Sequence, residues 1–157
     1  MKEKILITGA TGFLGKSIQK LLNGCNDKKL FLSDIKKSKK SNYIQCDLEN
    51  YISVKNLINK IRPDKIYHLA GTFTNDYKKD YLGNVVTTKN ILDSIIKIQI
   101  DCRTMLIGSA AEYGIKPEKG ALNENQELNP HSNYGLSKVF QTRLMRFYHN
   151  YYNLDIV

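Results

Sequence analysis

Short apolar runs alternate along this chain with longer stretches in which apolar residues recur every three or four positions. Runs of the first kind predict buried strands, and they lie at Lys4–Thr8, Lys29–Ser33, Tyr43–Gln45, Lys65–Leu69, Arg103–Gly108 and Leu154–Val157. Stretches of the second kind predict helices, and they lie at Phe13–Asn23, Ser53–Ile61, Tyr81–Ile98 and Ser132–Tyr152. The aligned apolar residues of the first helix are Leu14, Ile18, Leu21 and Leu22. Because strands and helices alternate, we expect an α/β fold: a doubly wound parallel sheet with helices on both faces.

A long irregular segment, Ser109–Asn129, separates the fifth strand from the last helix and contains Gly114, Pro117 and Gly120. Loops of this length inside a compact domain are usually functional. The chain of 157 residues is long enough for one domain with its own core. We therefore expect a single domain over residues 1–157, with the sixth strand truncated.

The composition, with 41% hydrophobic and 25% charged residues, is ordinary for a soluble globular protein. No apolar run approaches the roughly 20 residues of a membrane-spanning helix, and the N-terminus enters a strand without an apolar leader. We expect a cytoplasmic protein with no membrane partner. The cysteines Cys25, Cys46 and Cys102 lack metal-ligand spacing, so we expect idle thiols and no metal site.

The formal net charge of +9 raises the possibility of a nucleic-acid partner. The lysines are nevertheless widely spread, with one local cluster at Lys36, Lys37, Lys39 and Lys40. A solvated, lysine-rich surface therefore explains the charge better than a nucleic-acid function. Basic charge near a binding site would also attract anionic substrates such as nucleotide sugars.

The segment Thr8–Gly15 follows the first strand and places Gly9, Gly12 and Gly15 at three-residue intervals. A dinucleotide-binding turn needs one glycine for its tight bend, one for approach of the backbone to the pyrophosphate, and one for packing of helix on strand. The helix that follows points its free N–H groups at the phosphates. Strand, turn and helix together predict a Rossmann-type NAD(P) site. The cofactor residues predicted from this segment are Gly9, Thr11, Gly12, Phe13, Leu14 and Gly15.

Asp34 ends the second strand, about 20 positions after the glycines, where an acidic residue is expected to bind the adenosine ribose. A carboxylate there repels a 2′-phosphate, which favours NAD as the cofactor. Lys36 and Lys37 follow closely and could pair with such a phosphate, so NADP stays possible. The alternative is that Asp34 is only a turn residue at the strand end.

Two further segments lie at predicted carboxyl ends of strands, where an open α/β sheet binds its ligand. Asp47 and Leu48 could reach the adenine, and Leu69, Ala70 and Gly71 could line the middle of the cofactor. For Leu69 and Ala70, simple core packing is an alternative of nearly equal weight.

Tyr134 and Lys138 are four positions apart in the last predicted helix and so share one face. Carbonyl reduction with a nicotinamide needs a proton for the oxygen, and alcohol oxidation needs the reverse. A phenol ionises poorly at neutral pH, and a nearby cation favours its ionised form. We therefore predict Tyr134 as the acid/base and Lys138 as its partner. We expect both to contact the cofactor, Lys138 at the nicotinamide ribose. Ser109, at the end of the fifth strand, could hold the substrate oxygen, although an isolated serine there is typical of a turn.

The chain resembles the extended short-chain dehydrogenase/reductase family, especially its nucleotide-sugar branch. The segments that carry the resemblance run in family order: Thr8–Gly15, Asp34, Cys46-Asp47-Leu48, His68-Leu69-Ala70, Asn84 within Asn-Val-Val-Thr-Thr-Lys-Asn, Gly108–Gly114, and Pro130-x-Ser132-x-Tyr134-Gly135-Leu136-Ser137-Lys138. The resemblance implies that Tyr134 is the acid/base, Lys138 its partner, and Ser109 the hydroxyl at the substrate oxygen.

Two departures from the family pattern narrow this expectation. Sugar-nucleotide 4,6-dehydratases of the family carry an Asp-Glu pair directly after the serine position, where this chain has Ala110 and Ala111. Neither alanine can exchange a proton and Glu112 comes one residue later, so we expect 4-keto reduction, 4-oxidation or epimerisation. The segment Ser109–Gly114 most resembles GDP-4-keto-6-deoxymannose reductases and their relatives, which favours a reductase or an epimerase. Family members also carry a C-terminal substrate domain, so we expect these 157 residues to be the cofactor domain of a larger enzyme.

The resemblance also implies a partner, since family members often pair their long helices across a two-fold axis. Extra apolar positions, namely Val85, Leu92, Phe140 and Phe147, are compatible with such a homodimer. Packing against the sheet explains most of them equally well. The alternative function is a non-catalytic dinucleotide-binding module or redox sensor, against which the intact Tyr134, Lys138 and Ser109 argue.

Overall fold

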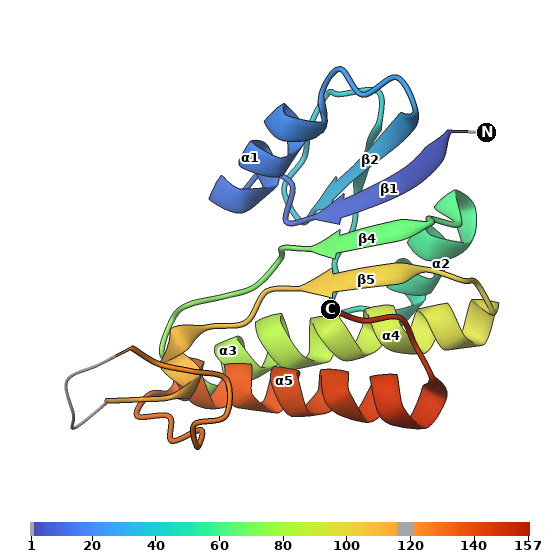
Figure 1. The fold of residues 1–157 in the computed structure, drawn as a ribbon. Coiled ribbons are helices and arrows are strands. Elements are labelled where there is room, and N and C mark those ends of the chain that lie inside the picture. The colour runs from blue at the N-terminus through green and yellow to red at the C-terminus, as the bar shows by residue number, and fades with distance from the viewer. Residues whose placement is uncertain (1, 116–120) are drawn as a thin grey trace.

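The computed structural model describes residues 2–115 and 121–157, and Pro117 and Gly120 of the irregular segment lie outside this range. Within the described residues, five parallel strands form one sheet in the order β3-β2-β1-β4-β5. Figure 1 shows β2, β1, β4 and β5 side by side in this order. The strands are β1 Glu3–Thr8, β2 Lys28–Asp34, β3 Tyr43–Gln45, β4 Lys65–His68 and β5 Arg103–Leu106. The predicted doubly wound parallel sheet is therefore confirmed.

The truncated sixth strand predicted at Leu154–Val157 is present only in part. The structure has an isolated parallel bridge between Thr104 and Ile156. Around it, Thr104 N–H donates to the carbonyl of Asp155 and Leu106 N–H donates to the carbonyl of Val157, each at 2.8 Å. The segment lies beside β5 as expected, but the pairing is too short to count as a strand.

The helices are α1 Phe13–Leu22, α2 Tyr51–Ile61, α3 Tyr77–Asp80, α4 Thr87–Ile98 and α5 Asn133–Tyr152, with a π-helical stretch η1 at Tyr81–Val86 and a 3₁₀ turn η2 at Ala110–Glu112. The helix predicted over Tyr81–Ile98 is thus divided, because its first six residues have π geometry. Among the described residues, no helix is both long and apolar enough to cross a membrane.

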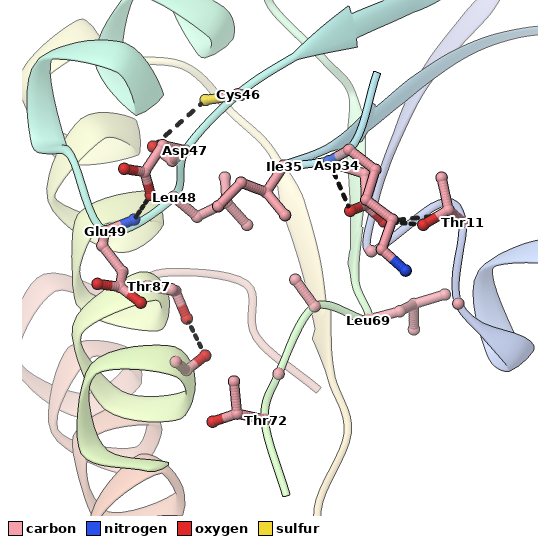
Figure 2. Close-up of a pocket in the computed structure, with 16 residues that line it drawn as sticks. Thr11, Asp34, Ile35, Cys46, Asp47, Leu48, Glu49, Leu69, Thr72 and Thr87 are labelled. Carbon is pink, nitrogen blue, oxygen red and sulfur yellow. Dashed lines mark hydrogen bonds between the residues drawn. The ribbon is translucent and has the colours of Figure 1, made fainter. Parts of the chain in front are cut away.

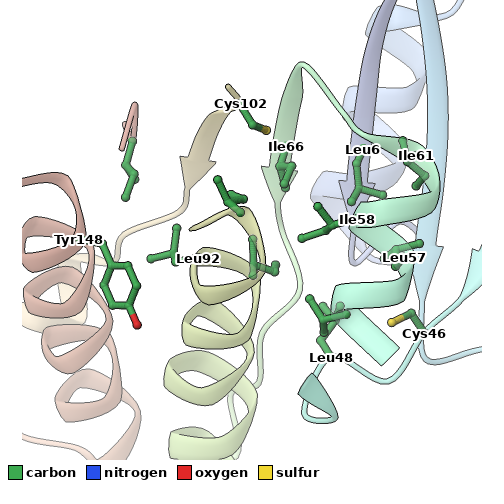
Figure 3. Packing of buried hydrophobic residues seen from close by; sticks show 14 residues of the cluster. Leu6, Cys46, Leu48, Leu57, Ile58, Ile61, Ile66, Leu92, Cys102 and Tyr148 are labelled. Atoms are coloured by element: carbon green, nitrogen blue, oxygen red, sulfur yellow. The ribbon is translucent and has the colours of Figure 1, made fainter. Parts of the chain in front are cut away.

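The core has two parts, one on each face of the sheet. On one face, Ile5 and Ile7 of β1 pack with Ile18 and Leu22 of α1. On the other face, Leu6 joins apolar side chains of α2, α4 and α5 (Figure 3). Because neighbouring residues of β1 point to opposite faces, helices cover both faces, as predicted.

The apolar face predicted for α1 is half wrong. Ile18 and Leu22 face the sheet, but Leu14 is 44% exposed and Leu21 is 74% exposed. Gly15 and Gln19 are the buried residues of α1 in their place. The small Gly15 lets the helix lie close to the glycine turn, which directs the face containing Gly15 and Gln19 at the sheet.

Candidate active site

The candidate site lies at the carboxyl ends of the strands. The chain leaves β1 toward β2 on one side, while β4 pairs on the other side of β1. An open α/β sheet binds its ligand at such a switch point. A cavity of about 340 Å³ opens there (Figure 2). Its lining residues are Gly9, Thr11, Gly12, Asp34, Ile35, Lys36, Cys46, Asp47, Leu48, Glu49, Leu69, Ala70, Gly71, Thr72, Gly83 and Thr87.

The three glycines of the turn differ in surroundings. Gly9 has a positive φ of 64°, and a Cβ there would lie 2.5 Å from the backbone nitrogen of Ala70. Gly12 lines the cavity and is the N-cap of α1. A Cβ on Gly15 would lie 2.3 Å from the Gly9 carbonyl oxygen. The geometry therefore fits the bend, the open approach and the helix–strand packing that a pyrophosphate-binding turn requires. No acidic residue occupies the first turn of α1, so its N–H groups suit an anion.

Asp34 joins the glycine turn to the cavity. Its Oδ2 accepts hydrogen bonds from the Thr11 N–H at 3.0 Å and the Thr11 hydroxyl at 2.8 Å. Burial alone would raise the pKa of Asp34, but the hydrogen bonds from Thr11, and from the backbone of Lys36 and Ile35, hold it below its ordinary value. The carboxylate is thus charged at neutral pH and orders the turn as well as lining the cavity.

The other predicted lining residues have two roles. Leu48 is buried in the core, and Leu69 and Ala70 pack against the two core clusters, yet all three line the cavity. All three residues therefore belong both to the core and to the wall of the cavity. Cys46 also lines the cavity, where burial and then the charge of Asp47 raise the pKa of its thiol to about 11. That thiol is protonated at neutral pH.

A second cavity, of about 210 Å³, adjoins the first and shares Leu69, Ala70, Gly71 and Thr72 with it. Its other lining residues are Leu14, His68, Phe73, Asn84, Ile107, Tyr134, Lys138 and Gln141. The structure thus brings the predicted pair Tyr134 and Lys138 to the same strand ends as the glycine turn, although the segments are more than 100 residues apart.

Lys138 is buried at 6% exposure. Its ammonium donates hydrogen bonds to the Ile107 carbonyl and to Gln141 Oε1. Burial lowers the pKa of Lys138 to about 8, and the negative charge of Glu112 partly opposes that shift. Tyr134 lies one turn earlier in α5 and contacts Phe73 edge-to-face, with ring centroids 4.7 Å apart.

Ser109 lies next to this cavity without lining it. Its hydroxyl accepts from the Ala111 N–H at 3.2 Å, and its own N–H donates to Glu112 Oε1 at 2.9 Å. The other carboxylate oxygen of Glu112 accepts from the Thr142 hydroxyl at 2.7 Å. Glu112 therefore ties the Ser109 turn to α5, and its carboxylate is occupied.

Three predicted site residues differ from the others because, in the described part of the chain, they are not part of a cavity wall. Within residues 2–115 and 121–157, neither cavity is lined by Phe13, Gly15 or Ser109. Phe13 is 85% exposed at the start of α1. Gly15 is buried by close packing, and Ser109 caps the 3₁₀ turn η2.

Asn84 and His68 are among the lining residues that were not predicted as site residues. Asn84 accepts from the Thr72 N–H at 2.9 Å and donates to the Thr72 carbonyl at 3.0 Å and to the Ser137 hydroxyl at 2.9 Å. It lies in η1, and π-helical turns are frequent at functional sites. His68 is buried between the hydroxyls of Thr8 and Thr87. Burial, and then the charge of Lys138, lower the pKa of His68 to about 3, so it is neutral.

The sheet, the glycine turn and the cavity at the switch point define a Rossmann-type dinucleotide-binding domain. The chain belongs to the NAD dependent epimerase/dehydratase family, whose model matches residues 5–157. This match confirms the resemblance predicted from the motifs. The family's NAD dependence agrees with the predicted cofactor.

Relatives with assigned activities match the chain almost throughout. GDP-6-deoxy-D-talose 4-dehydrogenase of Aggregatibacter actinomycetemcomitans is 30% identical over 98% of this chain and 51% of the relative. Uronate dehydrogenase of Pseudomonas putida is 28% identical over 98% of this chain and 58% of the relative. The Bordetella bronchiseptica enzyme WbmH, solved in complex with NAD+, superposes with a TM-score of 0.83 at 25% identity, over 99% of this chain and 54% of that one. The chain spans about half the length of the curated relatives it matches.

Proposed function

We propose that this chain is the NAD(P)-binding and catalytic domain of an oxidoreductase that acts on a nucleotide sugar, as a 4-keto-sugar reductase or a 4-epimerase/4-dehydrogenase. One observation carries the proposal. Two adjoining cavities connect the glycine turn to Tyr134 and Lys138 along the strand ends. A dinucleotide needs such a continuous site, with its phosphates at one end and its reactive ring at the other.

The residues of the first cavity fit the adenosine half of the dinucleotide. The turn at Gly9 and Gly12 receives the pyrophosphate, and the charged Asp34 faces the ribose hydroxyls. Asp34 favours NAD over NADP because it repels a 2′-phosphate. Lys36 lines the same cavity, which leaves NADP as a weaker ligand. When bound, the nicotinamide supplies or accepts the hydride of the reaction.

The protein's own residues move the proton. In reduction, the Tyr134 phenol donates its proton to the carbonyl oxygen, and in oxidation its phenolate takes the proton from the hydroxyl group. The buried ammonium of Lys138 stabilises the phenolate. The Ser109 hydroxyl accepts from the Ala111 N–H, and Glu112 binds the Ser109 backbone N–H. Among the described residues the hydroxyl donates to no partner, so its proton can go to the substrate oxygen.

The residues after Ser109 favour redox chemistry over elimination of water. Ala110 and Ala111 carry no group that exchanges a proton, and the Glu112 carboxylate binds Ser109 and Thr142. A nucleotide-linked substrate is supported by GDP-6-deoxy-D-talose 4-dehydrogenase. The similarity to uronate dehydrogenase gives a free uronate as the competing substrate to test.

The experiment is a screen of NAD(H)-linked absorbance change in the protein at its full natural length, with GDP-, UDP- and dTDP-sugars and free uronates. Tyr134→Phe should lower kcat by about 10²- to 10⁴-fold, the usual contribution of acid–base catalysis. The dissociation constant of NAD should stay within about twofold, because the phenol proton is not part of cofactor binding. Turnover at the wild-type rate in this variant would contradict the proposal. NAD binding without turnover of any sugar would favour the non-catalytic module.

We also propose that the protein forms a homodimer through α3, η1 and α5. Tyr77, Tyr81, Phe140 and Phe147 line a shallow hollow there. Tyr77, Phe140 and Phe147 are exposed, and Tyr81 is partly buried. Of the four positions considered from the sequence, Leu92 and Val85 are buried within the protein. Only Phe140 and Phe147 remain available for a partner.

A further inference from the structure

The segment after β4 is fixed on both sides of one aromatic residue, Phe73. On one side, the Asn84 side chain binds both backbone polar groups of Thr72. The Thr72 hydroxyl also donates to the Lys79 carbonyl at 3.1 Å. On the other side, the fully buried carboxylate of Asp80 accepts from the N–H of Thr74 at 2.8 Å and from its hydroxyl at 2.9 Å. Phe73 is therefore held at a fixed place.

The Phe73 side chain contributes little to the fold of this domain. It is 76% exposed, and it lines the second cavity together with Tyr134 and Lys138. Its ring meets that of Tyr134 at an interplanar angle of 78°. An exposed apolar ring that lines a cavity beside the proposed acid/base suits a binding surface, because ligand contact there removes apolar area from water.

We propose that Phe73 is a specificity-determining residue that packs against the C–H face of the substrate's sugar ring. This inference rests on the proposed function. A pyranose ring has an apolar face of C–H groups, and the negative face of an aromatic ring attracts their partial positive charge. The anionic diphosphate of such a substrate, or a carboxylate, would not pack favourably on the negative face of the Phe73 ring. Because Phe73 and Tyr134 are in contact, a sugar packed on Phe73 brings its hydroxyl and carbonyl oxygens close to the Tyr134 phenol.

The test compares three substitutions of Phe73 in the protein at its full natural length, using the sugar that the screen identifies as substrate. Phe73→Ala and Phe73→Leu should raise KM for that sugar about fivefold to tenfold, because both remove the aromatic face. Phe73→Tyr should keep KM within about twofold, since it retains the ring. Leu21→Ala, a change at a similarly exposed apolar residue on α1, is the matched control and should leave KM unchanged.

Two further measurements separate the alternatives. The dissociation constant of NAD should be the same in all variants, and the melting temperature should shift by less than about 2 °C. Weaker NAD binding in Phe73→Ala would overturn the inference, because the ring would then belong to the cofactor site. A wild-type KM in an active Phe73→Leu enzyme would overturn it too. A wild-type enzyme without turnover of any sugar refutes the proposed function, and this inference with it.

Discussion

Lys138 shows at the scale of one residue how function opposes stability in this domain. Its ammonium is buried, and its two hydrogen-bond partners, the Ile107 carbonyl and Gln141 Oε1, are neutral. Removing a charge from water is costly when no opposite charge pairs with it. Glu112 acts only as a more distant charge that favours the ammonium. A stable fold has no need of a cation here, whereas the proposed acid–base reaction at Tyr134 does.

The cost of Lys138 should appear as a dependence of stability on pH. Its folded pKa of about 8 lies below the ordinary value of 10.5, so the unfolded chain binds more protons between these values. This group's contribution to the free energy of unfolding therefore rises with pH across that window. Well below pH 8, Lys138 is protonated in both the folded and the unfolded chain, and the full destabilisation by its buried charge is present. Lys138→Met removes this contribution. The free energy of unfolding of the variant, minus that of the wild type, should therefore fall by about 2 kcal/mol between pH 7 and pH 10, because only the wild type gains stability there.

Urea denaturation of both proteins at pH 7, 8, 9 and 10 measures this difference. Other groups that titrate in the same range, including the buried thiols, cancel because they are present in both proteins. A stability difference that does not change with pH would show that Lys138 titrates near its ordinary value.

The glycine turn and α1 form one unit at the scale of elements. The helix lies so close to the turn that a Cβ on Gly15 would lie 2.3 Å from Gly9 O and 2.8 Å from Ala10 Cα. Both contacts are with backbone atoms, which cannot rotate away as a side chain can. The shape of the cavity thus depends on a glycine that does not line it.

Gly15→Ala should therefore impair folding and cofactor binding together. Overpacking of this kind costs about 1–3 kcal/mol, and any shift of the turn moves Gly12 in the cavity. We expect a lower urea midpoint and at least about tenfold weaker NAD binding by calorimetry. Lys20→Ala, at an exposed position on the same helix, is the control and should change neither. Wild-type NAD affinity in Gly15→Ala would contradict the tight packing.

The sequence predicted the elements whose pattern is local and missed those set by contacts. The strands and the glycine turn follow from runs of residue types within a few positions. The apolar face of α1 was half wrong because close approach at Gly15, a tertiary contact, decides which side faces the sheet. The π geometry at Tyr81–Val86 has the same apolar spacing as an α-helix, so periodicity could not reveal it. Likewise, no local sequence pattern around Asn84 predicts its hydrogen bonds to Thr72 and Ser137.

The residues of the candidate site also fall into two groups, those predictable from local spacing and those placed by tertiary contacts. Residues within the glycine turn and the Tyr134–Lys138 helix were predictable because their spacing carries the chemistry. Phe73 was not, because its place depends on Asn84 and Asp80, which hold its two neighbours. Ser109 was predicted from its strand end, and the structure adds Glu112 as the group that fixes it.

At the scale of the whole molecule, the exposed aromatic surface of α3, η1 and α5 should determine the oligomeric state. Light scattering of the protein at micromolar concentration should give the mass of two chains. Phe140→Glu combined with Phe147→Glu should give the mass of one chain, because each places a charge in a desolvated interface. Ile52→Glu, at an exposed apolar position on α2, should leave the dimer intact. A wild-type mass of one chain would refute the homodimer.

The lysine-rich segment lies next to β3, a short strand at one edge of the sheet. β3 is the outer strand on its side of the sheet and has three residues. The chain that leads into it carries four exposed lysines, Lys36, Lys37, Lys39 and Lys40. Sheets aggregate edge to edge when an outer strand is long, flat and uncharged, and short strands flanked by lysine prevent this. The charge that first suggested a nucleic-acid partner therefore protects an open sheet from pairing with its own copies.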